Sequence, residues 1–184
     1  MTDEVSVATR EVIRLGHPIL RKAAEPVPEN WMASERLNQL ADELIATMHS
    51  EDGAGLAAPQ IAESWRAMAY WVPESEDHDA IAPIVLINPE LKPVGNDQED
   101  GWEGCLSVPG LRGLVPRYTR VKVKARLVNG EQVSLTADGF HARVLQHEVD
   151  HLDGIVYLDR MTSPASLCYE QEWEKFVLGE HDLD

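Results

Sequence analysis

The stretch Gln146-His147-Glu148-Val149-Asp150-His151 contains the pattern His-Glu-x-x-His. On an α-helix, positions i and i+4 lie one turn apart on the same side, so His147 and His151 can bind one metal ion together. Glu148 follows the first histidine and can reach a water on that ion without being a ligand. Two histidines do not complete a metal site. The pattern therefore predicts a buried helix at the centre of the fold and a third ligand elsewhere in the chain.

Cys105, in the sequence Glu103-Gly104-Cys105-Leu106-Ser107, is the best candidate for the third ligand. A Cys/His/His set leaves a fourth position open for water, which is typical of catalytic rather than structural sites. Each signal alone has a simpler alternative: two surface histidines in the helix, and a small buried cysteine in the core. The other cysteine, Cys168, has no such neighbours, and we expect it to pack on a C-terminal helix.

A run of small residues, Gly53-Ala54-Gly55-Leu56-Ala57-Ala58-Pro59-Gln60, is the third distinctive stretch. It satisfies the dinucleotide pattern G-x-G-x-x-A, but that pattern must follow a strand and open a helix. Here a strong helical pattern precedes the run, so we reject that interpretation. Small residues let another backbone approach closely, and Gln60 adds a side-chain amide donor. The alternative is a purely structural glycine turn.

The periodicity of apolar residues predicts the main elements. It indicates a helix over residues 34–48 with Ser34 as its N-cap, and short strands over 67–72 and 84–87. Strict alternation over 120–128, a turn at Asn129-Gly130 and renewed alternation from 133 predict a hairpin. The helix with the histidines should run from about 140 to 153, and a final amphipathic helix should cover 164–178. Val108-Pro109 suggests an edge or loop. Strands followed by a central helix predict an α+β fold.

The composition bounds the class of protein. A chain of 184 residues is long enough for one buried core and short for two, so we expect a single domain over 1–184. The 16 basic and 32 acidic residues give a net charge of −16, which disfavours direct binding to nucleic acid. No apolar run approaches the ~20 residues of a membrane span. The N-terminus has neither the basic nor the apolar part of a signal peptide. We therefore expect a cytoplasmic enzyme with no membrane association.

Residues 53–60, 103–107 and 146–151, in this order and at these separations, resemble the three motifs of peptide deformylases. The likeness extends from about Val12 to Met161, so the family core would span about 12–161, and 162–184 would add a C-terminal helix and an acidic tail. The resemblance implies an α+β fold with mixed or antiparallel sheets around the central His-Glu-x-x-His helix. It also implies removal of the N-formyl group from the N-terminal methionine of newly synthesised polypeptides, with release of formate.

The resemblance also implies a metal and its ligands. Cys105, His147 and His151 would bind Fe²⁺, one per chain, for which Zn²⁺, Ni²⁺ or Co²⁺ can substitute. The ligand types alone would instead suggest Zn²⁺ first. A metal-bound water would attack the formyl carbon while Glu148 acts as general base and then as general acid. The Gln60 side-chain amide and the Leu106 backbone N–H would stabilise the oxyanion.

The motifs further imply how an N-formylmethionyl nascent peptide binds. It would lie extended between two short segments, with the methionine side chain near Val144 and the downstream residues near Arg112. The expected peptide-binding residues are therefore Ala54, Gly55, Gly104, Arg112 and Val144. Ala54 departs from the larger branched aliphatic residue common in the family, which would loosen the pocket. Glu103 and Arg117 are expected to form a supporting ion pair.

Two alternatives and one partner stay open at this stage. A zinc peptidase would use the same helical motif, although Cys105 and the Gln60 stretch weigh against it. A catalytically silent protein that binds N-formyl-Met peptides is the second alternative. Some deformylases dock on the ribosome through a basic C-terminal helix, but residues 170–184 are acidic here. We therefore expect any ribosome contact to be weak or to use another surface.

Overall fold

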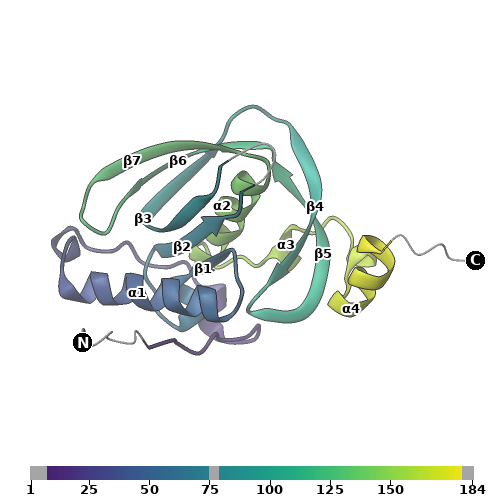
Figure 1. Cartoon of the computed structure of the whole chain (residues 1–184), viewed down its shortest axis with the longest axis horizontal. Coiled ribbons are helices and arrows are strands. Elements are labelled where there is room, and N and C mark those ends of the chain that lie inside the picture. The colour runs from purple at the N-terminus through teal and green to yellow at the C-terminus, as the bar shows by residue number, and fades with distance from the viewer. Residues whose placement is uncertain (1–7, 75–78, 180–184) are drawn as a thin grey trace, which may run out of the picture.

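Two antiparallel sheets enclose helix α2 in the computed structural model, which describes residues 8–74 and 79–179 (Figure 1). The larger sheet has the strand order β1-β2-β3-β6-β7, and the smaller one has the order β4-β5-β8. The strands of the larger sheet are β1 Gly55–Ala57, β2 Ala67–Val72, β3 Ile81–Pro93, β6 Arg120–Arg126 and β7 Gln132–Asp138. Those of the smaller sheet are β4 Gln98–Cys105, β5 Val108–Tyr118 and β8 Cys168–Tyr169. The result is a mixed helix and antiparallel-sheet domain, as expected.

The larger sheet is covered by a helix on each face, and strand β2 shows why. Successive side chains of a strand point to opposite faces. Met68 and Tyr70 belong to the apolar cluster that contains the buried residues of α2 (Gly139–Leu152), whereas Ala67 and Ala69 belong to the cluster of α1 (Glu35–Ser50). Because both faces are buried, β2 is an almost continuous apolar run. In Figure 1, α1 crosses one side of the sheet and α2 lies on the other.

The predicted helix and hairpin are confirmed at nearly the expected bounds. Helix α1 begins after Ser34, whose hydroxyl accepts a hydrogen bond from the Leu37 backbone N–H at 3.3 Å. In β6, Val121 and Val123 are buried while the alternating lysines are exposed. Gly130 adopts φ +88° in the turn to β7, a conformation that glycine reaches without steric cost. Periodicity decided these elements because each has one buried face.

Strands β4 and β5 were not predicted, and β3 is longer than the expected 84–87. Glycine and proline interrupt strands β4 and β5 at six positions and hide their alternation: Gly101, Gly104, Pro109, Gly110, Gly113 and Pro116. Of the suggestion that Val108-Pro109 lies at an edge or in a loop, the loop was wrong, because both residues belong to β5; β8 pairs with β5 only at Leu111 and Arg112. Pro109 is tolerated near the first residue of the strand, where a missing N–H costs little.

Helix α2 ends where it was predicted to end. Asp153 caps the helix, and Gly154 follows with φ +76°. A Cβ atom at Gly154 would lie 2.9 Å from the backbone of Arg21 and Lys22, so this position requires glycine for space as well as for conformation. The N-terminal segment is thereby packed against the end of α2.

The predicted amphipathic helix over 164–178 is confirmed only in its second half, because residues 164–169 form other structure and the helical residues are 170–178. A short 3₁₀ turn (Pro164–Ser166) is followed by β8, by α4 (Glu170–Trp173) and by a π-helical turn (Glu174–Leu178). Leu111 and Arg112 of β5 pair with Tyr169 and Cys168, so tertiary pairing overrides the helical pattern. Cys168 accordingly lies on a strand and not on a helix, and both cysteines are free. Residues 180–184 of the expected acidic tail lie outside the described residues.

The remaining helical segments are short. Helix α3 covers Tyr157–Arg160, and 3₁₀ turns cover Pro18–Arg21, Glu29–Trp31 and Ala58–Ile61. Tyr157 of α3 packs with Val108 and Val115 beneath the smaller sheet. Within residues 8–74 and 79–179, no helix has the length and apolar character to cross a membrane.

Candidate active site

A cavity of about 600 Å³ lies where the three motif stretches meet. The run of small residues supplies one wall, the end of β4 and the start of β5 supply another, and α2 supplies the floor. Residues predicted from the sequence that line it are Ala54, Gly55, Gln60, Gly104, Cys105, Leu106, Arg112, Val144, His147 and Glu148. His151 is 1% exposed and lies directly behind Cys105. The fold therefore gathers every predicted site residue in one place.

Cys105, His147 and His151 form a group that can hold a metal ion. Their ligand atoms lie within 4.8 Å of one another, and Cys105 Sγ is 3.2 Å from His151 Nε2. The two histidines project from successive turns of α2, and Cys105 ends β4. Burial disfavours the thiolate, but the charges of His151 and His147 outweigh it and lower the pKa of Cys105. One thiolate and two imidazoles, packed this closely in a buried site, fit a transition-metal ion.

Glu103 orients the first histidine. Its Oε2 lies 2.9 Å from His147 Nδ1, and its Oε1 accepts a hydrogen bond from Arg117 Nε at 2.9 Å. Burial opposes the charge on Glu103, but hydrogen bonds from His147 and Arg117 outweigh it and lower the pKa of this carboxyl group. An ionised carboxylate can only accept, so His147 Nδ1 carries the proton and Nε2 is left as the ligand atom.

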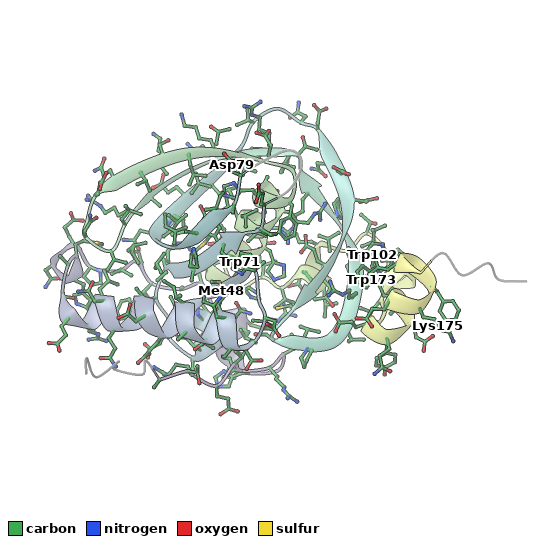
Figure 2. All side chains as sticks on the ribbon, viewed as in Figure 1. Met48, Trp71, Asp79, Trp102, Trp173 and Lys175 are labelled. Carbon is green, nitrogen blue, oxygen red and sulfur yellow. The ribbon has the colours of Figure 1, made fainter. Side chains whose placement is uncertain are left out.

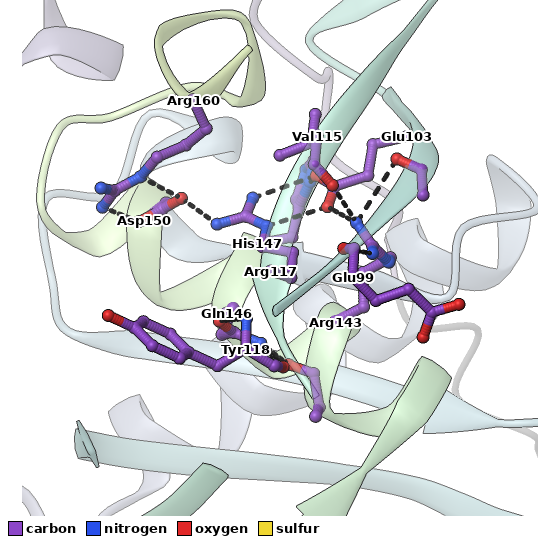
Figure 3. A network of polar contacts seen from close by, with 12 residues as sticks. Glu99, Glu103, Val115, Arg117, Tyr118, Arg143, Gln146, His147, Asp150 and Arg160 are labelled. Atoms are coloured by element: carbon purple, nitrogen blue, oxygen red, sulfur yellow. Dashed lines mark hydrogen bonds and ion pairs between the residues drawn. The ribbon is translucent and has the colours of Figure 1, made fainter. Parts of the chain in front are cut away.

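The carboxylate of Glu103 belongs to a larger buried network, drawn in Figure 3. Arg117 bridges Glu103 to Asp150, with Nη1 donating to Asp150 Oδ2 at 2.5 Å. Arg160 donates to the same carboxylate from the far side, at 2.7 and 3.1 Å. The side chains of Glu103 and Arg117 are only 4% and 5% exposed, so the predicted ion pair is confirmed as a buried one. Such a network fixes β4 and β5 against α2.

Glu148 lies at the base of the cavity, against the backbone of β1. A Cβ atom added at Gly55 would come within 2.4 Å of Glu148 Oε1, so only glycine leaves room for this carboxyl group. Glu148 is 4% exposed, and its Oε2 has no hydrogen-bond partner among the described residues. Burial raises the pKa of Glu148 to about 7. A carboxyl group with such a pKa can both take up and release a proton near neutral pH.

The contact between Gly55 and Glu148 gives a prediction. Gly55→Ala is expected to lower kcat/KM by about 10²-fold, because the methyl group displaces the Glu148 carboxyl group and displacements of ~1 Å cost this much. The unfolding midpoint should change little, since the displaced side chain borders an open cavity. Steady-state kinetics and thermal unfolding on the same preparation test the two statements. Activity close to that of the unsubstituted protein would show that Glu148 tolerates the methyl group.

Gln60 is held in a fixed orientation beside Cys105. Its Oε1 accepts from the Ala57 backbone N–H at 2.8 Å, and its Nε2 donates towards Ser107 Oγ at 3.3 Å and Cys105 Sγ at 3.6 Å. The side chain is 2% exposed. The acceptor side of the amide is therefore occupied by the backbone, and the donor side faces the candidate metal group.

Comparison with known proteins identifies the family. The sequence model of the family described as polypeptide deformylase matches residues 9–166. Peptide deformylase 2 from Pseudomonas putida is 41% identical over 165 residues, which cover 88% of this chain and 93% of that protein. The chain belongs to the polypeptide deformylase family. Members of this family are hydrolases that remove the N-formyl group from nascent peptides, and this chain is an enzyme of that class.

Further deformylases support the assignment. Peptide deformylase 1 from Prochlorococcus marinus is 42% identical over 172 residues, covering 91% of this chain and 88% of that protein. Among solved structures, the Met-Ala-Ser-bound class I type b peptide deformylase from Acinetobacter baumannii has a TM-score of 0.79 at 40% identity. That comparison covers 84% of this chain and 99% of the other. Similarity thus extends over most of each deformylase.

Sequence reasoning missed several residues around this deformylase site. Arg143 donates to Glu103 Oε1 at 2.9 Å and to the Val115 carbonyl at 2.8 Å, and its guanidinium occupies the space that a side chain at Gly101 would need. The sequence did offer one indication of this residue: Arg143 lies one helical turn before His147, so both side chains can reach the same carboxylate, that of Glu103. Glu170 could not be found from the sequence, since it reaches the cavity only through the β5–β8 pairing.

Proposed function

We propose that the chain hydrolyses the formyl amide of N-formylmethionyl nascent peptides and releases formate. The observation that carries this proposal is the position of Glu148, buried beside the Cys105, His147 and His151 group at the base of the cavity. A base next to a metal group in a cleft of this size suits the hydrolysis of an amide. The family match supports the formyl amide as the one that is cleaved.

The proposed metal is Fe²⁺, held by Cys105, His147 and His151 on the helix that carries the His-Glu-x-x-His motif, with Zn²⁺, Ni²⁺ or Co²⁺ able to substitute. The donor set accommodates any of these ions, and the choice of iron rests on the resemblance to the family. When bound, such an ion lowers the pKa of water towards about 7 and polarises a carbonyl group. Glu103 supports the site by holding His147 in the tautomer that leaves its outer nitrogen free.

The chain's own residues would move the proton and stabilise the developing charge. Glu148 takes a proton from the attacking water as the new carbon–oxygen bond forms at the formyl carbon. Glu148 then delivers that proton to the amine nitrogen as the carbon–nitrogen bond breaks. The Gln60 side-chain amide and the Leu106 backbone N–H donate to the oxygen that becomes negative. The buried, fixed amide of Gln60 supports this role.

The peptide would lie extended along the cavity. Ala54 and Gly55 line one wall and Gly104 the other, so their backbones can hydrogen-bond an extended chain between them. Val144 would form part of the pocket for the methionine side chain. Arg112 lines the same cavity, and the downstream residues of the peptide would pass beside it.

The decisive experiment is formate release from formyl-Met-Ala-Ser by anaerobically purified, Fe²⁺-loaded protein, with acetyl-Met-Ala-Ser as the control. Fast release from the formyl peptide alone supports the proposal. Cleavage of an internal peptide bond would instead indicate a zinc peptidase. Tight binding of the formyl peptide without release would indicate a catalytically silent binding protein.

The proposed iron leads to a prediction about oxygen. The Fe²⁺-loaded protein is expected to lose activity faster in air than under nitrogen, with oxidation of Cys105 detected by peptide mass spectrometry, because the thiolate is a metal ligand at an open site. The Zn²⁺-loaded protein is the control and should keep Cys105 reduced. Equal lifetimes of the iron form in both atmospheres would contradict the prediction.

We infer one catalytic domain with a family core over about 12–161, acting in the cytoplasm where nascent peptides are made. Any ribosome contact is weak or uses a surface other than the C-terminal segment, because residues 170–184 are rich in Glu and Asp. Deletion of residues 174–184, which leaves β8 and α4 in place, should not alter co-sedimentation with ribosomes. Loss of co-sedimentation on deletion would refute this inference.

A further inference from the structure

The C-terminal segment returns to the cavity from beyond the stretch matched by the family. Strand β8 pairs with β5 at Leu111 and Arg112. Glu170 follows the last residue of β8 and begins α4. Leu111, Arg112 and Glu170 all line the cavity. The family match ends at residue 166, so Glu170 lies outside the matched region.

Two contacts from α4 fix the guanidinium of Arg112. Its Nε and Nη2 donate to Glu170 Oε1 at 3.0 and 2.5 Å. Its Cζ lies 4.4 Å from the centre of the Trp173 ring, a cation–π contact. Trp173 in turn packs on Trp102 of β4, with ring centroids 6.3 Å apart, and Figure 2 shows the two rings together at the junction of α4 with the smaller sheet. The charge of Arg112 is thus paired within the protein.

The outer part of the cavity is therefore acidic. Glu51 and Asp52 line it next to the stretch of small residues, and both are exposed. With Glu170 they give the cavity lining three carboxylates, of which Glu170 pairs with Arg112. The other lining cation, Arg143, is engaged by Glu103. A side chain entering this region meets net negative charge.

We propose that Glu170 is a specificity-determining residue that, by pairing Arg112, makes the cavity prefer basic over acidic side chains downstream of the formyl-methionine. This inference rests on the proposed function, because it assigns the downstream peptide to the Arg112 end of the cavity. Without Glu170, Arg112 would be free to attract acidic side chains, and the preference would weaken or reverse. The chain thus sets its substrate preference through a segment outside the matched region.

The test compares formyl-Met-Ala-Lys-amide with formyl-Met-Ala-Glu-amide, whose blocked C-termini remove the terminal carboxylate. At low salt, kcat/KM should be about two- to fivefold higher for the lysine peptide, the range expected of exposed ion pairs. Glu170→Gln should weaken or reverse this preference, and Arg112→Gln should strengthen it. The preference of the unsubstituted protein should shrink at high salt, because exposed charges are screened.

Glu172→Gln is the matched control. It removes the same charge from the same helix, but Glu172 is exposed and does not line the cavity. Its ratio should equal that of the unsubstituted protein. An unchanged ratio in Glu170→Gln, or an equal change in Glu172→Gln, would overturn the proposal. Calorimetric binding of Met-Ala-Lys-amide and Met-Ala-Glu-amide gives the same comparison without turnover, so a missing deformylase activity is distinguished from a missing charge preference.

Discussion

Glu148→Gln is expected to lower kcat/KM for formyl-Met-Ala-Ser by about 10²–10⁴-fold, the usual contribution of a general acid–base group. Glutamine keeps the volume of the side chain but can neither accept the proton of the attacking water nor deliver it to the amine. The carboxyl group is buried at the base of the cavity, so no exposed acidic side chain of the rim can replace it. Steady-state formate release measures the loss.

The interpretation of this result requires that the metal site stays intact. Metal content per chain and the unfolding midpoint of Glu148→Gln should match those of the unsubstituted protein, because Glu148 is not one of the grouped ligands. Glu131→Gln, at an exposed position in the β6–β7 turn, is the control for a lost carboxylate. A variant that retains metal and more than a tenth of the activity would contradict the assigned role.

Glu103→Gln is expected to weaken metal binding by about 10–100-fold and to lower the free energy of unfolding by about 3–5 kcal/mol. The first effect follows from the contact with His147, since a neutral amide holds the imidazole less firmly. The loss of stability follows because Arg117 is buried and Arg143 is partly buried. Both guanidinium groups lose a buried counter-charge when Glu103 becomes neutral. Competition titration with Co²⁺ and urea-induced unfolding measure the two quantities.

Glu99→Gln provides the matched control on the same strand. Glu99 is exposed and contacts Arg143 only through its backbone carbonyl, so its side-chain carboxylate stabilises neither the metal site nor a buried guanidinium. Its metal affinity and stability should stay within about 0.5 kcal/mol of the unsubstituted protein. If Glu103→Gln behaved like Glu99→Gln, the carboxylate network would be dispensable to the metal site.

The sequence was most informative for features that depend only on residues close together in the chain, such as helical spacing, strand alternation and capping. The spacing of His147 and His151 placed both on one face of a helix, and the alternation over 120–126 placed Val121 and Val123 in the core. Capping chemistry likewise located the start of α1 at Ser34 and the end of α2 before Gly154. These features depend on backbone geometry within a few residues, so they can be read without knowing the neighbours.

Local rules failed where pairing partners lie far apart in the chain. The glycines and prolines of β4 and β5 gave no clear alternation, yet the two strands pair along most of their length. The predicted C-terminal helix begins only at Glu170, because residues 168 and 169 instead pair with β5 as a strand. In both cases long-range hydrogen bonding outweighs local propensity, which spans only about 1 kcal/mol.

The sequence by itself determined the chemistry: a cysteine, two histidines and a glutamate in motifs that specify a deformylase. The tertiary structure alone decided how that chemistry is held. Only the fold brings Arg143, Asp150 and Arg160 into the network around Glu103, and only the β5–β8 pairing carries Glu170 to Arg112. Reactive groups are fixed by residue type, but their positions and charges depend on contacts between segments far apart in the sequence, such as Arg112 and Glu170, which are 58 residues apart.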